Sequence, residues 1–479
     1  MATERDFITP AGVTVSTTAN VVGNTVSSDH FVNTLNANNY PVLTINFAKS
    51  GYLDPRVIFS RASSATYVDA DGYIKVAGNN VPRFQYSNGV CQGLLIEETR
   101  TNYLIVQTGY GASFFKQGTV TGPDGAPMTA FIPPAGWITN YDSPHAAGSF
   151  HTPSTAVGAN TDYVYTVYLG PTIGNTSDLT FDLVIVADLN GASPVYGEWV
   201  INTSTWTTVY RYASSPWSEI SSSLIQDSQT GIYKATWIVR LTGDATGRNR
   251  VGAGSQIRSQ SNPFWVADGV GGVQFACAQF EAGAWPTSYI PTTTTSATRA
   301  ADNVSMSCGT FEFNPRQGTL FVEAISYKPY SSSTSSANDR ASLATFLSDW
   351  SLRSSVPYNE LTVRREDSDY SISAVFYDPQ LGFTSSGSPA NIGLPNTVIK
   401  AAVSYFSNGY MYIAANGNIA TSGQNTYTPP LGNQTDPTKT ILNIGNYYAP
   451  SQRPLNGVMR KLIYWQYPLS NTEITNITL

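Results

Sequence analysis

Few residues of this chain have the types and spacing that catalysis needs. The sequence contains no GxSxG turn, no HExxH pair and no phosphate-binding loop with its lysine and hydroxyl. Histidine, the most frequent general base, occurs at only three positions, which are His30, His145 and His151. The three cysteines form no CxxC pair and lie far apart, at Cys91, Cys277 and Cys308. We therefore expect three buried thiols, and no enzymatic activity, cofactor or metal ion.

Paired carboxylates are the other possible source of chemistry, because two of them carry out glycoside hydrolysis. Glu97 and Glu98 are neighbours, and adjacent residues of a strand point to opposite faces, so they cannot act as an acid/base pair. We expect them to form structural ion pairs with Arg61, Arg83 or Arg100. A pair assembled from distant parts of the chain stays open, and a hydrolase is the less favoured alternative.

Sugar binding is better supported than catalysis. Aromatic rings pack on the apolar face of a pyranose, while Asn, Asp, Gln or Arg side chains satisfy its hydroxyls. A loop such as Asn446-Tyr447-Tyr448-Ala449-Pro450 offers both kinds of side chain. The candidate glycan-binding residues are Trp350, Arg353, Tyr377, Asn446, Tyr447 and Tyr448. Further aromatic candidates, each of which can instead belong to a core or an interface, are Trp206, Tyr210, Tyr212, Trp217, Trp265 and Tyr358.

Short β-strands must position these side chains. Apolar and polar residues alternate with period two, and Gly, Pro, Asn or Asp separate the runs, which is typical of β-sandwiches. The clearest strands are 163–169, 179–186, 207–212, 231–241, 272–280, 318–325, 360–365, 371–377, 398–405, 409–415, 441–445 and 458–465. Residues 341–352 also fit one helical face, and we predict a strand there. Ser470 followed by Glu473 predicts a capped helical turn at the end.

The stretch 59–104 predicts two β-ribbons. Asp69-Ala70-Asp71-Gly72 stands between two β-rich runs, and Ser87-Asn88-Gly89 stands between two more. Gly accepts the positive φ that hairpin turns need. The first turn resembles part of a calcium loop, but it lacks the third oxygen position and the terminal Glu, so we expect only a turn.

Two strings in the chain carry a resemblance to a known family. The first is FSRASSATYVDADG, followed by VPRF and GLLIEETRTNYL, within residues 59–104. The second is QFEAGAWPTSYIPT, at residues 279–292. They closely resemble segments of tailed-bacteriophage fibre and other virion appendage proteins, in the usual order and spacing. The resemblance implies a carbohydrate-binding-like jelly roll in the middle of the chain. The later runs AVSY, YIAANG, LNIG and LNGVMRKLIYW resemble a concanavalin or laminin G-like lectin fold.

We therefore predict an all-β protein with an N-terminal arm and two β-sandwiches. Residues 1–58 form the arm, which serves virion attachment or oligomerisation, and residues 59–105 form a β-ribbon connector. Residues 106–295 form the carbohydrate-binding-like sandwich, and residues 296–479 form the concanavalin or laminin G-like one. The link between the sandwiches is the polar stretch 291–300.

Composition limits the partners. Charged residues make up only 12% of the chain and the net charge is −6, which disfavours nucleic acid. No apolar run is long enough for a membrane span, and the N-terminus carries no signal peptide, so we expect synthesis in the host cytoplasm.

The resemblance implies a virion structural protein, a tail fibre, tip or decoration fibre, on the surface of the phage particle. Its expected partners are host surface polysaccharide, other virion proteins through the arm, and copies of itself, with a trimer as the family's common state. The sequence shows no heptads that would confirm a trimer. The alternatives are a purely architectural subunit and a depolymerising tailspike.

Overall fold

The structure is a computed structural model in which the chain forms two compact units, residues 1–40 and 41–479. It describes residues 40–104, 115–132, 135–136, 161–174, 179–189, 192–213, 217–227, 230–241, 248–259, 267–329, 340–348, 358–366, 369–378, 382–388, 390–420, 425–426, 431–433, 436, 439–447 and 453–479. Only Tyr40 of the first unit is among them, so the account below concerns the second unit.

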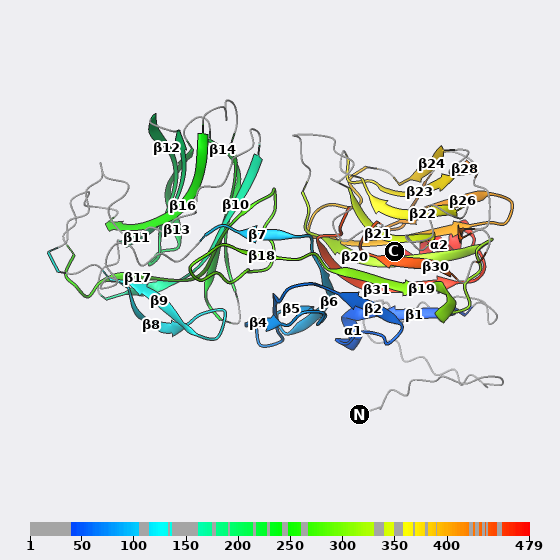
Figure 1. The fold of residues 1–479 in the computed structure, drawn as a ribbon, viewed down its shortest axis with the longest axis horizontal. Helices are drawn as coiled ribbons and strands as arrows, with labels where there is room; N and C mark the ends of the chain where they lie inside the picture. Colours follow the sequence, from blue (N-terminus) through cyan, green and yellow to red (C-terminus); the bar gives the residue numbers. More distant parts are fainter. Residues whose placement is uncertain are drawn as a thin grey trace. The chain divides into compact units, whose positions relative to one another are not determined.

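The first sandwich packs a six-stranded sheet against a four-stranded one (Figure 1). In sheet order, the six strands are β14 (Trp217–Gln226), β15 (Tyr233–Leu241), β10 (Thr161–Ile173), β17 (Gly272–Ala282), β9 (Pro127–Phe131) and β8 (Phe115–Thr121). The four strands are β13 (Thr207–Ala213), β12 (Ala192–Asn202), β11 (Leu179–Leu189) and β16 (Arg248–Ser259). Alternate side chains from both sheets, including Trp199, Trp237 and Phe181, fill one apolar core.

The second sandwich contains a nine-stranded and an eight-stranded sheet. The path through the first sheet runs β27 (Asn418–Ile419), β26 (Tyr410–Ala415), β25 (Val398–Tyr405), β20 (Gly318–Ser326), β31 (Gly457–Trp465), β6 (Val90–Ile96) and β5 (Phe84–Ser87), with β1 (Leu43–Asn46) on β31 and β28 (Asn425–Thr426) on β26. The second sheet runs β2 (Val57–Ser60), β19 (Asn303–Ser307), β30 (Thr440–Ile444), β21 (Ala341–Ser348), β22 (Tyr358–Arg365), β23 (Ile372–Asp378) and β24 (Gly382–Gly387), with β29 (Gly432–Asn433) on β22. Tyr405, Tyr464 and Phe346 belong to the core between them.

The predicted all-β fold with two sandwiches is confirmed. The predicted strand at 341–352 is confirmed as β21, which ends at Ser348. The prediction did not single out β8, β9, β12, β14 and β16, which complete the sheets of the first sandwich. Strand β14 reads WSEISSSLIQ and strand β16 reads RNRVGAGSQIRS, so small and polar residues hide the period of two.

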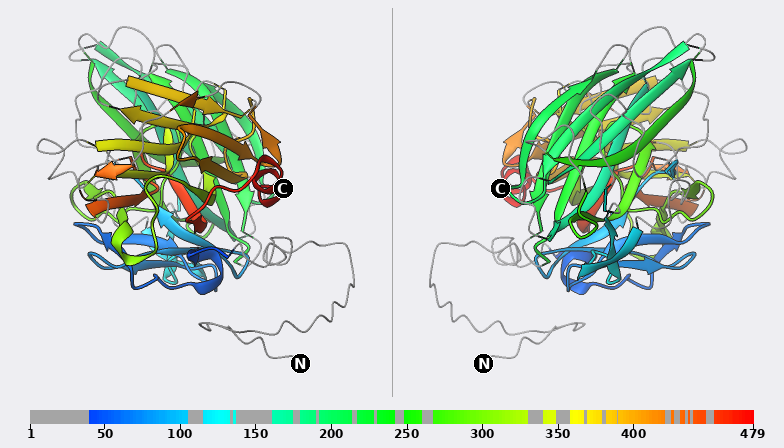
Figure 2. Two further views of the ribbon diagram at one scale, coloured as in Figure 1. Left: turned by 90° about the vertical axis from the view of Figure 1, so that its right-hand side faces the viewer. Right: turned by 90° about the vertical axis from the view of Figure 1, so that its left-hand side faces the viewer.

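Residues 41–58 differ from the predicted arm, because they form part of the second sandwich. Strand β1 pairs with β31, and β2 pairs with β19 (Figures 1 and 2, blue). Leu43, Ile45 and Val57 are buried in the second core. The predicted arm therefore extends at most to residue 40, and residues 1–39 lie outside the described part of the chain.

Both hairpins predicted in the stretch 59–104 form. Strands β3 (Ala65–Val68) and β4 (Ile74–Ala77) pair across the Asp69–Gly72 turn, where the Asp69 carboxylate accepts hydrogen bonds from the backbone of Asp71 and Tyr73. This carboxylate closes a turn, as predicted. Strands β5 and β6 pair across Asn88 and Gly89, both with positive φ, and they extend the nine-stranded sheet instead of forming a separate connector.

The helices are short. Those in the described part of the chain include α1 (Phe47–Ser50), η2 (Cys308–Thr310) and α2 (Asn471–Ile477). The predicted capping box is confirmed at the start of α2, where the Ser470 hydroxyl accepts from Glu473 N and the Glu473 side chain accepts from Ser470 N. Within the described residues, no helix is long and apolar enough to cross a membrane.

Replacing Ser470 by Ala should therefore lower the free energy of unfolding by about 1 kcal/mol, because the backbone N–H of Glu473 loses the Ser470 hydroxyl as its acceptor. Chemical denaturation of the full chain measures the change. Thr472→Ala is the matched control, since Thr472 is exposed on the same helix and should change stability by less than about 0.5 kcal/mol. Equal midpoints for the two variants would contradict a stabilising role of the cap.

Candidate functional site: a buried ionic junction

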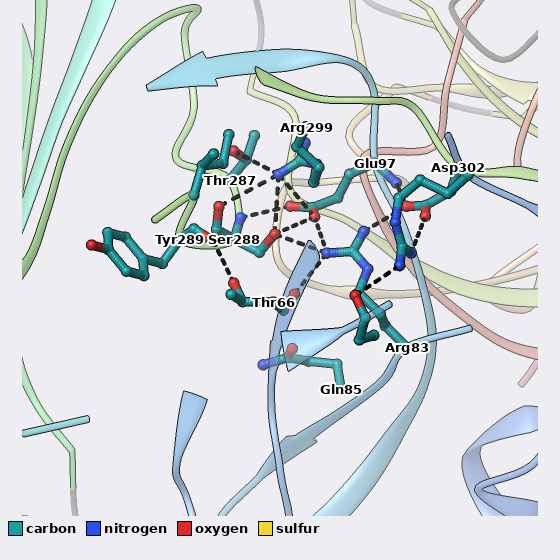
Figure 3. Close-up of polar contacts among 12 residues, drawn as sticks. Thr66, Arg83, Gln85, Glu97, Thr287, Ser288, Tyr289, Arg299 and Asp302 are labelled. Atoms are coloured by element: carbon teal, nitrogen blue, oxygen red, sulfur yellow. Dashed lines mark hydrogen bonds and ion pairs between the residues drawn. The ribbon is translucent and has the colours of Figure 1, made fainter. Parts of the chain in front are cut away.

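A group of buried charged residues lies where the two sequence strings meet (Figure 3). We call Arg61, Arg83, Glu97, Ser288, Arg299 and Asp302 the junction network. The Asp302 carboxylate is fully buried and accepts hydrogen bonds from Arg61 Nη1 at 3.0 Å, Arg83 Nη2 at 2.5 Å and the backbone N of Glu97 at 2.9 Å. Three donors thus surround this one carboxylate, which satisfies its burial.

Glu97 is the second buried carboxylate of the network. Its Oε2 lies 2.8 Å from Arg83 Nη1 and 3.2 Å from Arg299 Nη1, and it accepts a hydrogen bond from the Ser288 hydroxyl at 2.6 Å. Its Oε1 accepts from Ser288 N at 2.7 Å. Burial alone would raise the pKa of Glu97, but the charges of Arg299 and Arg83 and the Ser288 hydrogen bonds outweigh it and lower the pKa to about 2. Glu97 is therefore ionised at neutral pH.

A smaller group extends the junction network. Arg100 Nη2 lies 2.6 Å from Glu98 Oε1, and the Arg100 guanidinium stacks over the Trp285 ring at 4.6 Å. Gly283 has a φ of +141°, and a Cβ there would fall 1.4 Å from Arg100 Nη1. The glycine of the GAWPTSYIPT string is thus required by both its backbone conformation and the arginine packed on it. Asn456 Nδ2 donates to Glu98 Oε2 from the second sandwich.

The junction network joins the two sandwiches. Glu97 directly follows β6 in the nine-stranded sheet, whereas Ser288 follows β17 of the first sandwich. Arg299 bridges both sides, because its guanidinium donates to the Ser288 hydroxyl and to the carbonyl of Glu98 at 2.6 Å. The link 291–300 is itself held, since β7 (Arg100–Asn102) pairs with β18 (Ala297–Arg299). The two strings therefore form one interlocked connection.

This arrangement suits a structural role. The Ser288 hydroxyl donates to the Glu97 carboxylate, which is already paired with Arg83 and Arg299. Because of these two ion pairs, Glu97 is a poor base and does not suit activation of Ser288 as a nucleophile. In the described part of the chain, no group of three or more His, Cys, Asp or Glu side chains could hold a metal ion. The ion pairs predicted for Glu97 with Arg83 and for Glu98 with Arg100 are confirmed. Arg299, which was not predicted, also pairs with Glu97, and Arg61 pairs with Asp302 instead.

The structure places three of the six predicted glycan-binding residues. Tyr377 on β23 is half-buried and pairs across the strands with Glu360 of β22. Tyr447 is also half-buried, and its hydroxyl donates to Glu360 Oε2 at 2.5 Å while the Arg453 guanidinium lies over its ring at 4.5 Å. Tyr377 and Tyr447 thus flank one carboxylate on the eight-stranded sheet. Their role in sugar binding stays a prediction.

Asn446 lies apart from that pair. It is 1% exposed, and its Nδ2 donates to the Asp302 carbonyl at 3.1 Å, so its position favours a structural role beside the junction network. Trp350, Arg353 and Tyr448 lie outside the described residues.

The other aromatic candidates are divided. Trp217 is buried in the first core, and the Tyr210 hydroxyl donates to Glu198 at 2.9 Å. Trp206 is half-buried and stacks on Tyr233 with ring centroids 3.8 Å apart. Trp265 and the side chains of Tyr212 and Tyr358 lie outside what the structure describes.

Sequence reasoning missed Ser288, Arg299 and Asp302. Ser288 belongs to the string 279–292, which the sequence analysis used only for its family resemblance. Arg299 lies in the predicted link 291–300, and Asp302 lies just after it. A signal was present, because a low-charge chain that places Arg299 and Asp302 just after a polar link must give these charges partners.

A search against protein-family models finds no match, and neither does a search of curated proteins. Among solved structures, the chain is similar to the Ruminococcus gnavus IT-sialidase CBM40, with 14% identity and a TM-score of 0.26 over 34% of this chain and 83% of that one. It is also similar to a leech intramolecular trans-sialidase complexed with 2,7-anhydro-Neu5Ac, with 15% identity and a TM-score of 0.26 over 36% and 26%. These likenesses are too partial to support an argument about function.

Proposed function

We propose that this chain is a structural subunit of a bacteriophage appendage, a tail fibre, tip or decoration fibre, that adheres to host surface glycans. The observation that carries the proposal is the junction network. The two strings that resemble phage fibre proteins meet there, where Ser288 of the second string donates two hydrogen bonds to Glu97 of the first and so connects the two sandwiches.

A buried network of this kind suits an appendage better than an enzyme. Separating the sandwiches would take the N–H and hydroxyl of Ser288 away from the buried Glu97 carboxylate, which would lose two hydrogen-bond donors. The sandwiches therefore resist being pulled apart, and surfaces that they carry keep a fixed relation. Rigid presentation favours adhesion by many copies, since several weak sugar contacts, each about millimolar, add up to tight attachment.

Tyr377 and Tyr447 support the adhesive part of the proposal. The two aromatic rings are half-buried and offer an apolar surface, and the buried Glu360 carboxylate fixes the Tyr447 ring by accepting its hydroxyl. The same junction also suits a purely architectural subunit that binds neighbouring virion proteins, and this remains the second candidate.

The test measures binding of the full chain to host cells and to their isolated surface polysaccharide. We expect saturable binding that falls at least about tenfold in Tyr447→Ala, because a lost aromatic contact of about 1.4 kcal/mol has that effect. Tyr412→Ala is the matched control, since Tyr412 is 37% exposed on β26 of the other sheet and should leave binding unchanged.

Three outcomes decide between the candidates. If the full chain does not bind either target, the adhesive proposal fails and the architectural role stands. Release of reducing ends from the polysaccharide would identify a depolymerase instead. Absence of the chain from purified phage particles, measured by mass spectrometry, would overturn the virion assignment in both forms.

A further inference from the structure

A cavity of about 310 Å³ lies beside the junction network. Its size is at the lower end of small-molecule sites and suits one or two sugar rings. Three parts of the chain line it: Tyr67 and Gln85 come from the ribbons, Tyr168 and Lys234 from the first sandwich, and Asn396 from the second. Glu97 and Ser288 of the junction network form part of its wall (Figure 3).

Three polar side chains of this cavity make no hydrogen bond or ion pair within the described part of the chain. Among the residues that the structure describes, no hydrogen bond or ion pair engages the Lys234 amino group, the Tyr168 hydroxyl or the Asn396 side-chain amide. The sheet explains how two of them come together, since Lys234 and Tyr168 are paired across β15 and β10 on the face turned away from the core. Lys234 Nζ lies 5.7 Å from the centre of the Tyr168 ring. The half-buried Lys234 and Tyr168 and the exposed Asn396 are therefore available to a bound molecule.

Charge indicates which kind of molecule fits. Two charged residues line the cavity, Glu97 and Lys234, and the Glu97 carboxylate is already paired with Arg83 and Arg299 behind the wall. Lys234 adds a positive charge that, in the described part of the chain, no carboxylate neutralises. A ligand with one negative charge therefore gains an ion pair in a partly enclosed site, where screening by water is reduced.

We propose that this cavity binds a sugar residue that carries a carboxylate, such as a uronic acid unit of the host polysaccharide. Lys234 binds the carboxylate, the side chains of Gln85 and Asn396 satisfy hydroxyls, and the rings of Tyr67 and Tyr168 contact the apolar face of the sugar. The inference rests on the proposed function for its glycan. It adds a second, acid-specific site, distinct from the Tyr377–Tyr447 pair.

Calorimetric titration of the full chain with two matched pairs of sugars tests the proposal. Glucuronic acid is compared with glucose, and galacturonic acid with galactose, at concentrations up to about 10 mM. We expect at least one acid to bind at least about tenfold more tightly than its neutral partner, with an affinity that falls as salt rises. Equal binding within both pairs, or no binding of either acid, would overturn the proposal.

Variants locate the site. Lys234→Met should weaken binding of the acid at least about tenfold, whereas Lys439→Met, at an exposed lysine of the second sandwich, should leave it unchanged. Lys234 is half-buried on an outer sheet face, so we expect the variant to fold, and its melting temperature checks this. If Lys234→Met has lost stability, Asn396→Gly provides the second variant, because Asn396 is exposed and its φ of +60° suits glycine, and we expect weaker binding of the same acid. Unchanged binding in both would refute the site.

The two proposals can fail separately. If the chain binds host polysaccharide and Lys234→Met binds it equally well, the cavity proposal fails while adhesion stands. If the full chain binds the uronic acid but neither cells nor polysaccharide, adhesion fails while the cavity remains a saccharide site.

Discussion

Replacing Arg83 by Met is expected to lower the free energy of unfolding by about 3–5 kcal/mol. Arg83 is fully buried and is the residue that connects both carboxylates of the junction network, with Nη1 on Glu97 and Nη2 on Asp302. The same guanidinium donates to the Thr66 carbonyl and the Ser288 hydroxyl. Met fills much of the space but carries no charge, so two buried carboxylates lose a shared cation, and the Thr66 carbonyl and the Ser288 hydroxyl each lose a donor.

Denaturant unfolding of the full chain, followed by circular dichroism, measures this loss. The matched control is Arg56→Met. Arg56 also pairs with a carboxylate, that of Asp54 at 2.7 Å, but its side chain is 34% exposed, so we expect a loss of only about 0–1 kcal/mol. If Arg83→Met unfolds at the same denaturant concentration as Arg56→Met, the junction network does not stabilise the chain.

The fold was largely predictable because most strands show their alternation in the sequence. Strands such as β10 and β31 carry large apolar residues on one face, and the turns between strands use Gly, Asn and Asp. The pairing between strands far apart in the chain could not be predicted from the sequence. Strand β1 is four residues long, and it is held by β31, more than 400 residues later. Local pattern carries no information on such a partner, so these residues were interpreted as an arm.

The candidate site was predictable only in part, for a related reason. The ion pairs of Glu97 and Glu98 could be predicted because burying an unpaired charge is costly, and Arg83 was among the expected partners. Ser288 and Asp302 are about 190 and 205 residues away from Glu97 and were joined to it only by the fold. The cavity at Lys234 could not be predicted from the sequence either, because the residues that line it come from the ribbons and from both sandwiches, far apart in the chain.

Acid should weaken the junction network, and Glu97→Gln should remove this pH dependence. The pKa of Glu97 is lowered from 4.5 to about 2 in the folded chain. A lowered pKa means that ionised Glu97 stabilises the fold fully above pH 4.5 and that this contribution is lost as the pH falls from 4.5 towards 2. Since one pKa unit corresponds to about 1.4 kcal/mol, the contribution is about 3 kcal/mol.

The measurement is the difference in unfolding free energy between the natural chain and Glu97→Gln across this pH range. Gln keeps the shape of the side chain but does not titrate, so the difference should shrink by about 3 kcal/mol between about pH 6 and pH 2. Asp54→Asn is the control: a hydrogen bond from Arg56 lowers the pKa of Asp54, but that pair is partly exposed, and we expect a smaller change. A difference for Glu97→Gln that stays constant down to pH 2 would mean that Arg83 and Arg299 do not hold Glu97 ionised, and the junction network would then lose its central ion pair.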